Sequence, residues 1–448
     1  MLIAILTNFQ WERTWVVQET VVAKKATIHY DILSAPWTMF SRAATNYMLE
    51  RATGDVNNYE MRFSRHPLDA VARFVMEIES TMKEWRDGQS CELLSLLQKF
   101  RNRKSSDSRD KVFAFLGIAN QLHLRNPVLP DYNLAGAEVF RRTTIQILSN
   151  TGSLSILAGP TQRELDGMMP SWVIDWSFSP GSNDYERLKQ LSLYNADSHP
   201  STIILHEPMI LETKALFVDV ITSVAPVAPE DGMARLRNII LQWYETGWHR
   251  RGRYGTTSNA FWRVVCGDVL YMGHSDAPST YQRATEAGRD GFNVWREDNA
   301  NKRNRNTSIY GDYTFEYAEP EEKSKIKNSF HYAVQTASGA RRYFTTRNNY
   351  VGVGPLRAQA GDYVFVLSGS RVPFILRPST RSHKCNSCVL QVLVFGDIAT
   401  NTFGQRCEAQ HEDCFQLIGD AYVHGIMDGQ VRKSDVGNSM APQTIFIV

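Results

Sequence analysis

Residues 105–119 read SSDSRDKVFAFLGIA, in which a charged opening runs into an aromatic and aliphatic block. This pattern predicts one short helix. Asp107 or Ser108 can cap its start, because a short side-chain oxygen accepts a hydrogen bond from an unpaired amide of the first turn. Asp110 lies in that first turn, where the helix dipole favours a negative charge. An apolar face and a terminating glycine complete the pattern: Val112, Phe113, Leu116 and then Gly117.

The same stretch resembles the R-D-K-V-(Y/F)-A-L-L-G-(L/I)-A segment of fungal heterokaryon incompatibility (HET) domain proteins. WERTWVVQETVVA at residues 11–23, the Asp131-Tyr132 pair and PSWVIDWS at residues 170–177 resemble further segments of that family, in the same order. GDYVFVLSGSRVPFILRP from Gly361 and GDAYVHGIMDG from Gly419 are similar to the tails of large HET-domain proteins. The residues that carry these motifs are Trp11, Arg13, Trp15, Gln18, Arg109, Asp110, Lys111, Gly117, Trp172, Asp175, Trp176, His424 and Asp428.

Two family motifs that precede the W-x-R-x-W helix do not occur in this sequence. One is a strand resembling S-Y-x-W-G, and the other is a segment resembling W-I-D-A-L-C-I-N-Q. The resemblance therefore leads us to expect a HET domain that lacks its N-terminal part. Either the truncation is genuine, or coding sequence upstream of Met1 supplies the missing strands.

Composition indicates a soluble intracellular chain. The 448 residues carry 49 basic and 47 acidic side chains, for a net charge of +2, which gives no reason to expect binding to nucleic acid or to an anionic membrane. No apolar run approaches the roughly 20 residues of a membrane span, and MLIAIL lacks the basic leader of a secretory signal. Six cysteines in so long a chain are typical of a reducing compartment. We therefore expect a cytoplasmic protein.

Apolar periodicity predicts a helix-rich first half and a β-rich end. Helices are expected at residues 7–23, from Pro67, and at 93–100, 139–152 and 233–243, with strands at 27–33 and within 203–224. Short β-like runs between residues 342 and 448, punctuated by Gly and Pro, predict a small antiparallel sheet or barrel. The polar stretch 284–327 predicts a long mobile loop rather than a nucleic-acid site, despite its KRNRN cluster.

These elements amount to an α+β fold in four parts. Residues 1–120 form a partial HET domain, which the family resemblance makes the remnant of a TIR-like α/β domain. A helical and mixed region (121–283) and the polar loop (284–327) follow, and residues 328–448 form a small antiparallel β-rich domain.

Glu19 is the candidate catalytic residue. HET domains are thought to be distantly related to TIR domains, some of which cleave NAD with a helix glutamate in a segment resembling S-x-W-C-x-x-E. Trp15 and Glu19 have that W-x-x-x-E spacing, and Trp11, Trp15 and Val22 predict an apolar stripe that contains Glu19. A carboxylate there is costly unless it is paired or its pKa rises. A structural role, in which Glu19 caps an amide or pairs with Arg13 or Arg109, is the interpretation we favour.

The remaining constellations favour structure over chemistry. Zinc favours cysteine and histidine ligands, but the cysteine spacings are too irregular to predict a metal site, and we expect none: Cys385, Cys388, Cys407 and Cys414, with His383 and His411. His424 and Asp428 lie in the glycine-flanked YVHGIMDG and predict a turn-rich structural element. Neither phosphate-cradling glycine motif is present, so no cofactor is expected, except NAD if Glu19 is catalytic.

Three functions are compatible with the sequence. The resemblance implies a protein of fungal nonself recognition and programmed cell death, which acts by contact with other proteins of the incompatibility response. The first alternative is a TIR-like NAD hydrolase that uses Glu19. The second is a non-catalytic paralogue with a regulatory or binding role. We favour a role in nonself recognition and programmed cell death, without enzymatic activity.

Overall fold

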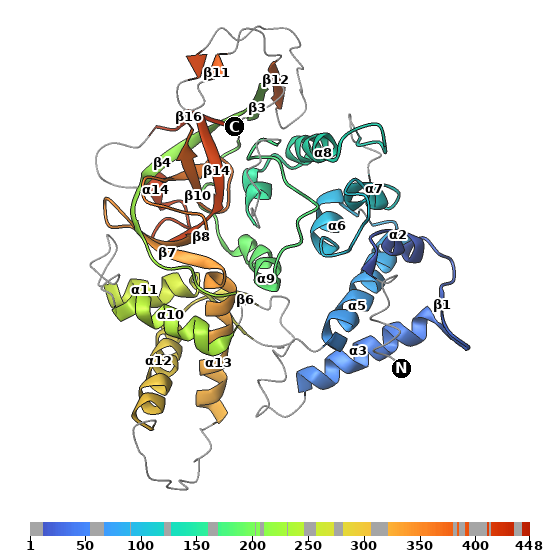
Figure 1. Cartoon of the computed structure of the whole chain (residues 1–448), viewed down its shortest axis with the longest axis horizontal. Coiled ribbons are helices and arrows are strands. Elements are labelled where there is room, and N and C mark those ends of the chain that lie inside the picture. Colours follow the sequence, from blue (N-terminus) through green and yellow to red (C-terminus); the bar gives the residue numbers. More distant parts are fainter. Residues whose placement is uncertain are drawn as a thin grey trace. The chain divides into compact units, whose positions relative to one another are not determined.

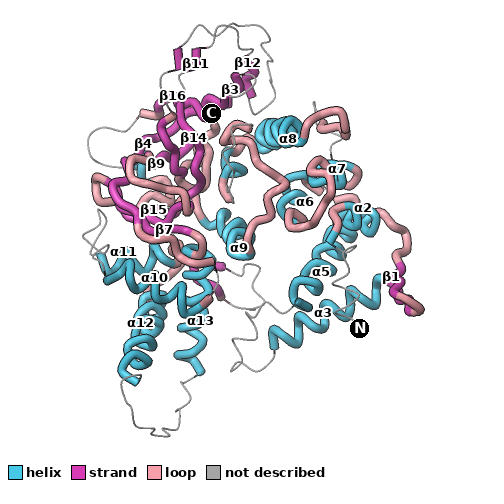
Figure 2. Tube along the Cα trace, viewed as in Figure 1, coloured by secondary structure: helices cyan, strands magenta, loops and turns pink. Residues whose placement is uncertain are grey.

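The chain folds into two compact units. The computed structural model describes residues 12–53, 67–89, 91–120, 127–159, 169–201, 203–206, 210–230, 232–245, 257–272, 281–305, 321–379, 383–384, 390–393, 410–411, 414–433 and 441–448. Unit 1 comprises Met1–Asn150 and Asp175–Pro180, and unit 2 comprises Thr151–Ile174 and Gly181–Val448. Helices prevail in unit 1, whereas the strands gather in unit 2 (Figures 1 and 2). The predicted α+β class is confirmed, with a helix-rich first part and a β-rich end.

Unit 1 is a set of helices with one β-hairpin. The elements are α2 (Trp15–Val21), β1 (Thr27–Tyr30), β2 (Leu33–Pro36), α3 (Trp37–Thr53), α5 (Pro67–Arg86), α6 (Leu93–Lys99), α7 (Asp110–Leu116) and α8 (Gly136–Thr151). The expected helices at residues 93–100 and 139–152 are therefore present, as is the one that begins at Pro67. The first expected helix is described from Trp15 onward, and its proposed cap at Thr7 lies outside the described residues.

Helix α7 lies at the centre of the unit 1 core. Val112, Phe113, Ala114 and Phe115 are all buried, and the ring of Phe115 stacks on Phe100 of the α6 end at 5.7 Å. The helix is therefore covered on more sides than the one-faced pattern predicts. Such burial contributes about 1.5 to 3 kcal/mol for each large apolar side chain.

Helix α7 ends at Gly117 as expected, but the predicted side-chain cap at its start does not form. The N-cap residue is Arg109, which makes no side-chain cap. Asp107 instead accepts a hydrogen bond from the Arg109 amide at 2.9 Å. This short-range turn is available to Asp because its side chain reaches the amide two residues ahead. Gly117 itself has a φ of −75°, which is open to any residue.

A closed ring of five strands forms the centre of unit 2. β4 (Ile210–Val224) pairs with β16 (Gln443–Ile447), β16 with β14 (Cys414–Asp420), β14 with β10 (Phe374–Pro378), β10 with β9 (Tyr363–Leu367), and β9 again with β4. The predicted small barrel is thus present, but it includes β4, which the sequence pattern assigns to an earlier region. The β14–β16 pair is parallel, contrary to the expectation of an antiparallel sheet, because β16 returns after the long connection that follows β15 (Tyr422–Val423).

Further strands extend this ring. Beside β4 lie, in order, β7 (Arg341–Thr346), β8 (Val351–Pro355) and β15. β4 also pairs with β3 (Ile203–His206), which in turn pairs with β12 (Leu390–Leu393). Two short pairs stand apart: β5 (Val269–Tyr271) with β6 (Tyr281–Arg283), and β11 (His383–Lys384) with β13 (Gln410–His411). Both faces of the barrel wall are buried, since Val364 and Val366 join the core around Leu216, while Phe365 contacts the ring of Phe217 at 5.5 Å.

The helices of unit 2 correct one expectation. They are α9 (Ser182–Gln190), α10 (Met233–Glu245), α11 (Thr257–Val265), α12 (Ala287–Arg305), α13 (Glu321–Ser338) and α14 (Gln430–Lys433), with short 3-10 turns at Leu154–Leu157 and Leu191–Leu193. Residues 287–305 and 321–327, expected as part of a loop, are helical. Helices α12 and α13 run side by side (Figure 1).

A few apolar residues hold this helix pair together. Phe292 and Trp295 of α12 are buried, and each ring lies 5.8 Å from that of Phe330 on α13. Their spacing of three residues places them on one helix face, so two large rings are enough to anchor a helix that is otherwise polar. Within the described residues, none of the helices combines the length and apolarity of a membrane span.

Candidate functional site

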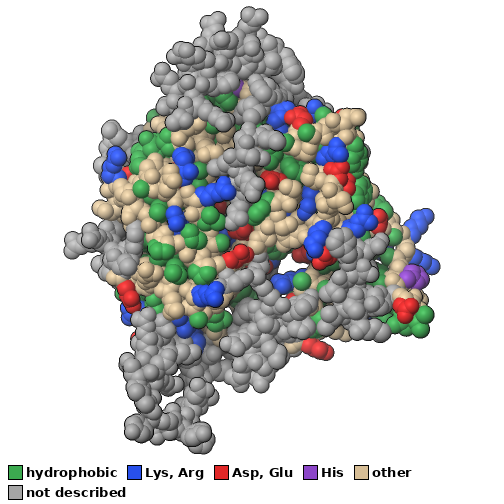
Figure 3. Space-filling view, viewed as in Figure 1, with side chains coloured by type: hydrophobic (Ala, Val, Ile, Leu, Met, Phe, Trp, Pro, Cys, Tyr) green, Lys and Arg blue, Asp and Glu red, His purple; other side chains and the backbone are tan. Residues whose placement is uncertain are grey.

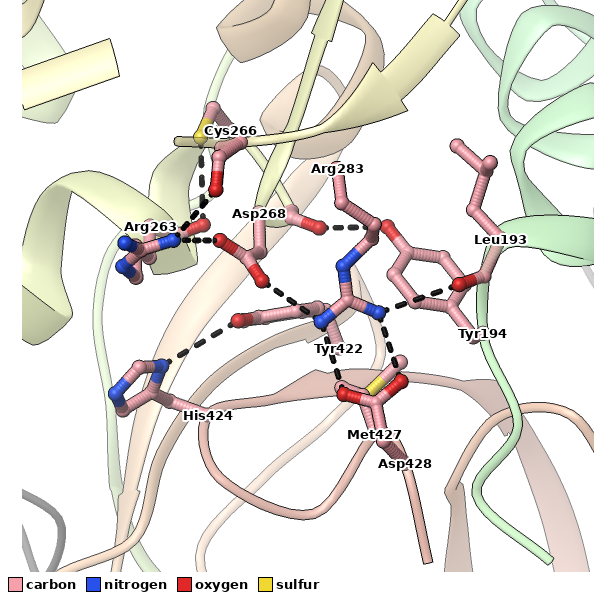
Figure 4. Close-up of polar contacts among 12 residues, drawn as sticks. Leu193, Tyr194, Arg263, Cys266, Asp268, Arg283, Tyr422, His424, Met427 and Asp428 are labelled. Carbon is pink, nitrogen blue, oxygen red and sulfur yellow. Dashed lines mark hydrogen bonds and ion pairs between the residues drawn. The ribbon is translucent and has the colours of Figure 1, made fainter. Parts of the chain in front are cut away.

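A cluster of charged and aromatic side chains surrounds Asp268 in unit 2 (Figure 4). Asp268 follows α11 in a tight turn, in which Gly267 and Asp268 have φ values of 64° and 55°. Glycine adopts this left-handed conformation freely, and Asp tolerates it better than most residues. The turn directs the Asp268 carboxylate inward, where the residue is 8% exposed.

Two arginines neutralise this carboxylate. Arg263 of α11 donates to Oδ1 of Asp268, and Arg283 of β6 donates to Oδ2 at 2.8 Å. Arg283 also donates to both carboxylate oxygens of Asp428 at 3.0 Å. Arg283 therefore lies between two carboxylates, one buried and one exposed (Figure 4).

Aromatic rings enclose the arginine. The Arg283 guanidinium lies 5.3 Å from the ring centre of Tyr194, a distance that suits a cation–π contact. The Tyr194 hydroxyl donates to the carbonyl of Gly267 at 2.6 Å, and its ring lies 6.2 Å from that of Tyr422. Burial raises the pKa of both tyrosines, so both hydroxyls stay protonated at neutral pH.

His424 and Cys266 border the cluster without forming a catalytic pair. Burial lowers the pKa of His424; the Asp268 carboxylate opposes this shift, and the guanidinium charges of Arg263 and Arg283 add to it. The imidazole, 3.4 Å from the Tyr422 hydroxyl, is thus neutral at neutral pH. Burial also raises the pKa of the Cys266 thiol to about 12, which leaves it without the thiolate that a nucleophile needs.

The cluster is chemically suited to holding elements together. The charges of its arginines and carboxylates compensate one another, and its tyrosine, histidine and cysteine side chains are in their neutral forms. Asp428 is joined to β6 through Arg283, so the YVHGIMDG segment is held against the β5–β6 hairpin. His424 and Asp428, which the sequence places in one turn, thus lie in the same cluster but do not bind each other.

An open hollow of about 610 Å³ adjoins the cluster. Leu193 and Tyr194 belong to both, since the Leu193 carbonyl accepts a hydrogen bond from Arg283. Tyr194, Asp197, His199 and Arg371 are the titratable residues among those that line it.

The R-D-K residues of unit 1 organise nearby backbone. Arg109 pairs with Asp107 at 2.6 Å and donates to the carbonyls of Tyr132 and Leu134. The Tyr132 hydroxyl in turn donates to Asp110 at 2.6 Å. The Asp-Tyr pair that the sequence places between two motifs therefore contacts the first of them.

Lys111, which belongs to α7, is also buried. Its Nζ donates to the carbonyl of Arg101 at 3.0 Å and to that of Arg103. Burial lowers the pKa of Lys111 to about 8, and the charges of Arg101 and Arg103 add to this effect.

Glu19 does not lie on an apolar face. The buried residues of α2 are Val17, Thr20 and Val21, and Glu19 is exposed while Trp15 is half-buried. The predicted stripe is wrong because the helix turns its 17-20-21 face inward. Arg109 pairs with Asp107, and the structural role that we favour for Glu19 stays a prediction. Trp11 lies outside the described residues.

Other motif residues have structural contacts. The side chain of Gln18 of α2 lies against Gly117. Trp172 and Trp176 are buried. Asp175 accepts hydrogen bonds from the amide and hydroxyl of Ser177, and its carbonyl accepts one from Arg101 at 2.7 Å.

The cysteine and histidine constellation is only partly described. His383 and His411 face each other in the β11–β13 ladder, and Cys414 is a buried free thiol. Cys385, Cys388 and Cys407 lie outside the described residues. Among the residues that the structure describes, no group of three or more potential metal ligands occurs.

Sequence reasoning missed the residues that build the cluster and the hollow. The Gly267-Asp268 pair directly after an apolar helix is a turn signal that could have drawn attention to Asp268. Arg283 and Arg371 give no such signal, because their partners lie far away in the sequence.

Two comparisons relate this chain to known proteins. Residues 252–391 match the family described as the Het-6 beta-barrel domain; this range contains Arg263, Asp268 and Arg283, together with β9 and β10 of the ring. Heterokaryon incompatibility protein 6, OR allele, of Neurospora crassa is 24% identical over an alignment of 382 residues that covers 73% of this chain and 49% of that protein. The chain thus spans about half the length of this curated relative. No solved structure matches.

Proposed function

We propose that this chain, which is similar to a fungal heterokaryon incompatibility protein and to the Het-6 beta-barrel family, acts in nonself recognition and contributes to the programmed cell death of incompatible fusions. The observation that carries this proposal is the 24% identity to heterokaryon incompatibility protein 6 across 73% of the chain. The matched barrel range is only 140 residues long, whereas the alignment to this relative has 382 residues. The similarity therefore extends beyond the barrel region.

The proposed mode of action is contact with other fungal proteins of the incompatibility response, in the cytoplasm and without a cofactor. The compensated charges around Asp268 support this mode, since a catalytic centre needs groups with poised pKa values. On the face in Figure 3, basic and acidic side chains are interspersed. That distribution supports a protein partner rather than nucleic acid, which binds to a surface of one sign.

The test is a fusion assay between two fungal strains. One strain expresses this chain, and the other carries a divergent incompatibility background. We expect more dead fusion compartments, scored with a vital dye, than in pairings where the chain is absent. Equal death in both pairings contradicts the proposal.

NAD cleavage by Glu19 is the second candidate, based on the Trp15–Glu19 spacing. The exposed carboxylate argues against it, because a glycosidic cleavage needs an oriented ribose and a site that excludes water. We expect purified protein to release no nicotinamide from NAD. Release that is lost in Glu19→Gln would establish the enzyme instead. A regulatory paralogue without a role in cell death is the third candidate, and a silent fusion assay together with partner binding would support it.

A further inference from the structure

The hollow beside the Asp268 cluster has a fixed framework. Its wall segment, residues 194–197, pairs with the β9–β10 turn, because the amides of Ala196 and Asp197 donate to the carbonyls of Arg371 and Ser370 at 3.0 Å. The amide of Asn195 donates to the Met427 carbonyl at 2.9 Å. The hollow is therefore bordered by backbone that is hydrogen-bonded on both sides, and its volume of about 610 Å³ is typical of ligand sites.

The one carboxylate among its lining residues is already neutralised. Asp197 is almost fully buried, and Arg432 binds both of its oxygens, at 3.1 and 2.8 Å. The backbone amide and Nδ1 of His199 also contact Oδ1 of Asp197, at 3.1 and 2.7 Å. These contacts hold the His199 ring at the rim, with its Nε2 edge facing away from Asp197.

Arg371 is different, because its charge is not compensated by an acidic partner among the described residues. Its amide donates to the Ser155 hydroxyl at 3.0 Å, which fixes the backbone. One guanidinium nitrogen makes long contacts of 3.4 Å to the carbonyls of Ser192 and Tyr194. The rest of the guanidinium is exposed and retains donors for a ligand.

We propose that this hollow binds an acidic peptide segment of a partner protein, with a carboxylate of that segment on Arg371. A planar guanidinium matches a carboxylate in a two-bond fork. The exposed polar side chains of Asn195, Ser198 and His199 line the same hollow, where they suit the amides of an extended peptide. This inference rests on the proposed function, because it names the surface through which the protein contact is made.

The test is a binding titration on the full chain. The probe is a short fluorescein-labelled peptide of alternating Glu and Ser, compared with a peptide that has Gln in place of each Glu. Fluorescence anisotropy at low salt reports the affinity. We expect the Glu peptide to bind about tenfold or more tightly than the Gln peptide, and Arg371→Ala to abolish that difference. Arg371→Lys should restore part of it, because the charge remains without the fork.

Arg347→Ala is the matched control, since Arg347 is an exposed arginine on the β7–β8 turn of the same barrel. Equal losses in Arg371→Ala and Arg347→Ala overturn the proposal, as does equal affinity for the two peptides. Inorganic phosphate that binds through Arg371 while the Glu peptide does not would also overturn it and mark a small-anion site. Arg371-dependent peptide binding together with a silent fusion assay would refute the proposed function and leave the peptide site standing.

Discussion

Gln18 and Gly117 lie so close together that a Cβ atom on Gly117 would be 2.7 Å from Nε2 of Gln18. The φ of Gly117 is −75°, so the close approach of the side chain, and not the backbone conformation, favours glycine here. Gln18 belongs to the W-x-R-x-W helix and Gly117 to the R-D-K-V segment. The contact therefore joins two sequence motifs that are almost a hundred residues apart.

The effect of Gly117→Ala on the free energy of unfolding should therefore change sign when Gln18 is replaced. In the wild-type background the added methyl group displaces the Gln18 amide and lowers the free energy of unfolding, by about 1 kcal/mol. In a Gln18→Ala background the space is free, and Gly117→Ala should stabilise by about 0.4 to 1 kcal/mol through the unfolded chain. Urea unfolding of the four proteins measures the cycle. If Gly117→Ala changes the free energy of unfolding equally in both backgrounds, the contact between Gln18 and Gly117 does not contribute to stability.

Phe113→Ala and Asp110→Asn should differ widely in cost. Phe113 is 3% exposed, and its ring lies 5.1 Å from that of Tyr132. Its truncation should cost about 3 to 5 kcal/mol and visibly lower the melting temperature.

Asp110→Asn retains an oxygen that accepts from the Tyr132 hydroxyl, so it should lose only the interaction with the helix dipole, about 0.3 to 1 kcal/mol. Thermal melts of the two variants make the comparison. Greater damage from Asp110→Asn would mean that the carboxylate charge, and not the buried ring, holds this helix start.

Local signals explain why part of the fold could be predicted. Pro67 and the apolar spacing after it define α5, and the uninterrupted run Tyr363–Leu367 defines β9. Barrel closure has no local signal, because it depends on distant pairs such as Cys414 with Phe446. Helix α12 was missed because its apolar content is small and its polar residues are typical of a loop.

In the candidate site, too, residues with a local sequence signal could be predicted, and residues paired over long distances could not. His424 and Asp428 could be singled out because they lie in one short motif. Their partner Arg283 is 145 residues from Asp428, and nothing in a single sequence pairs two such charges. Glu19 was misplaced because two tryptophans suggested the buried face of α2, whereas Val17 and Val21, each 0% exposed, occupy it.

Lys111 should make unfolding depend on alkaline pH. Burial lowers its pKa to about 8 in the folded protein, whereas an unfolded lysine titrates near about 10.4. Between these values the unfolded chain binds more protons, so the free energy of unfolding rises with pH. This contribution is complete above the unfolded pKa and is lost as pH falls through the folded one.

The measurement is urea unfolding of wild type and Lys111→Met at about pH 7 and about pH 10. The difference between the two proteins should shift in favour of wild type at the higher pH. Lys104→Met, which removes an exposed lysine, is the control and should show no such shift. A pH-independent difference for Lys111→Met would mean that Lys111 keeps an ordinary pKa in the folded chain.

The ion pair of Arg341 and Asp420 should be among the costliest contacts to break. Their side chains are 5% and 7% exposed and lie 3.0 Å apart. Burial by itself raises the pKa of Asp420, but the charges of Arg341 and Arg187 outweigh it and lower that pKa. Asp420→Asn leaves buried guanidinium charge uncompensated and should cost about 3 to 5 kcal/mol.

Lys189→Gln is the control for this last prediction, since the exposed Lys189 pairs with Glu186 of the same helix and this contact should contribute only about 0 to 1 kcal/mol. Acid adds a second readout. Because the folded pKa of Asp420 is lowered, its contribution is present above the unfolded pKa of about 3.9 and is lost as pH falls below it. The stability gap between wild type and Asp420→Asn should therefore narrow in acid. A gap that is small at neutral pH, or that does not narrow, would mean that packing around Arg341, and not its charge pair, stabilises this part of the barrel.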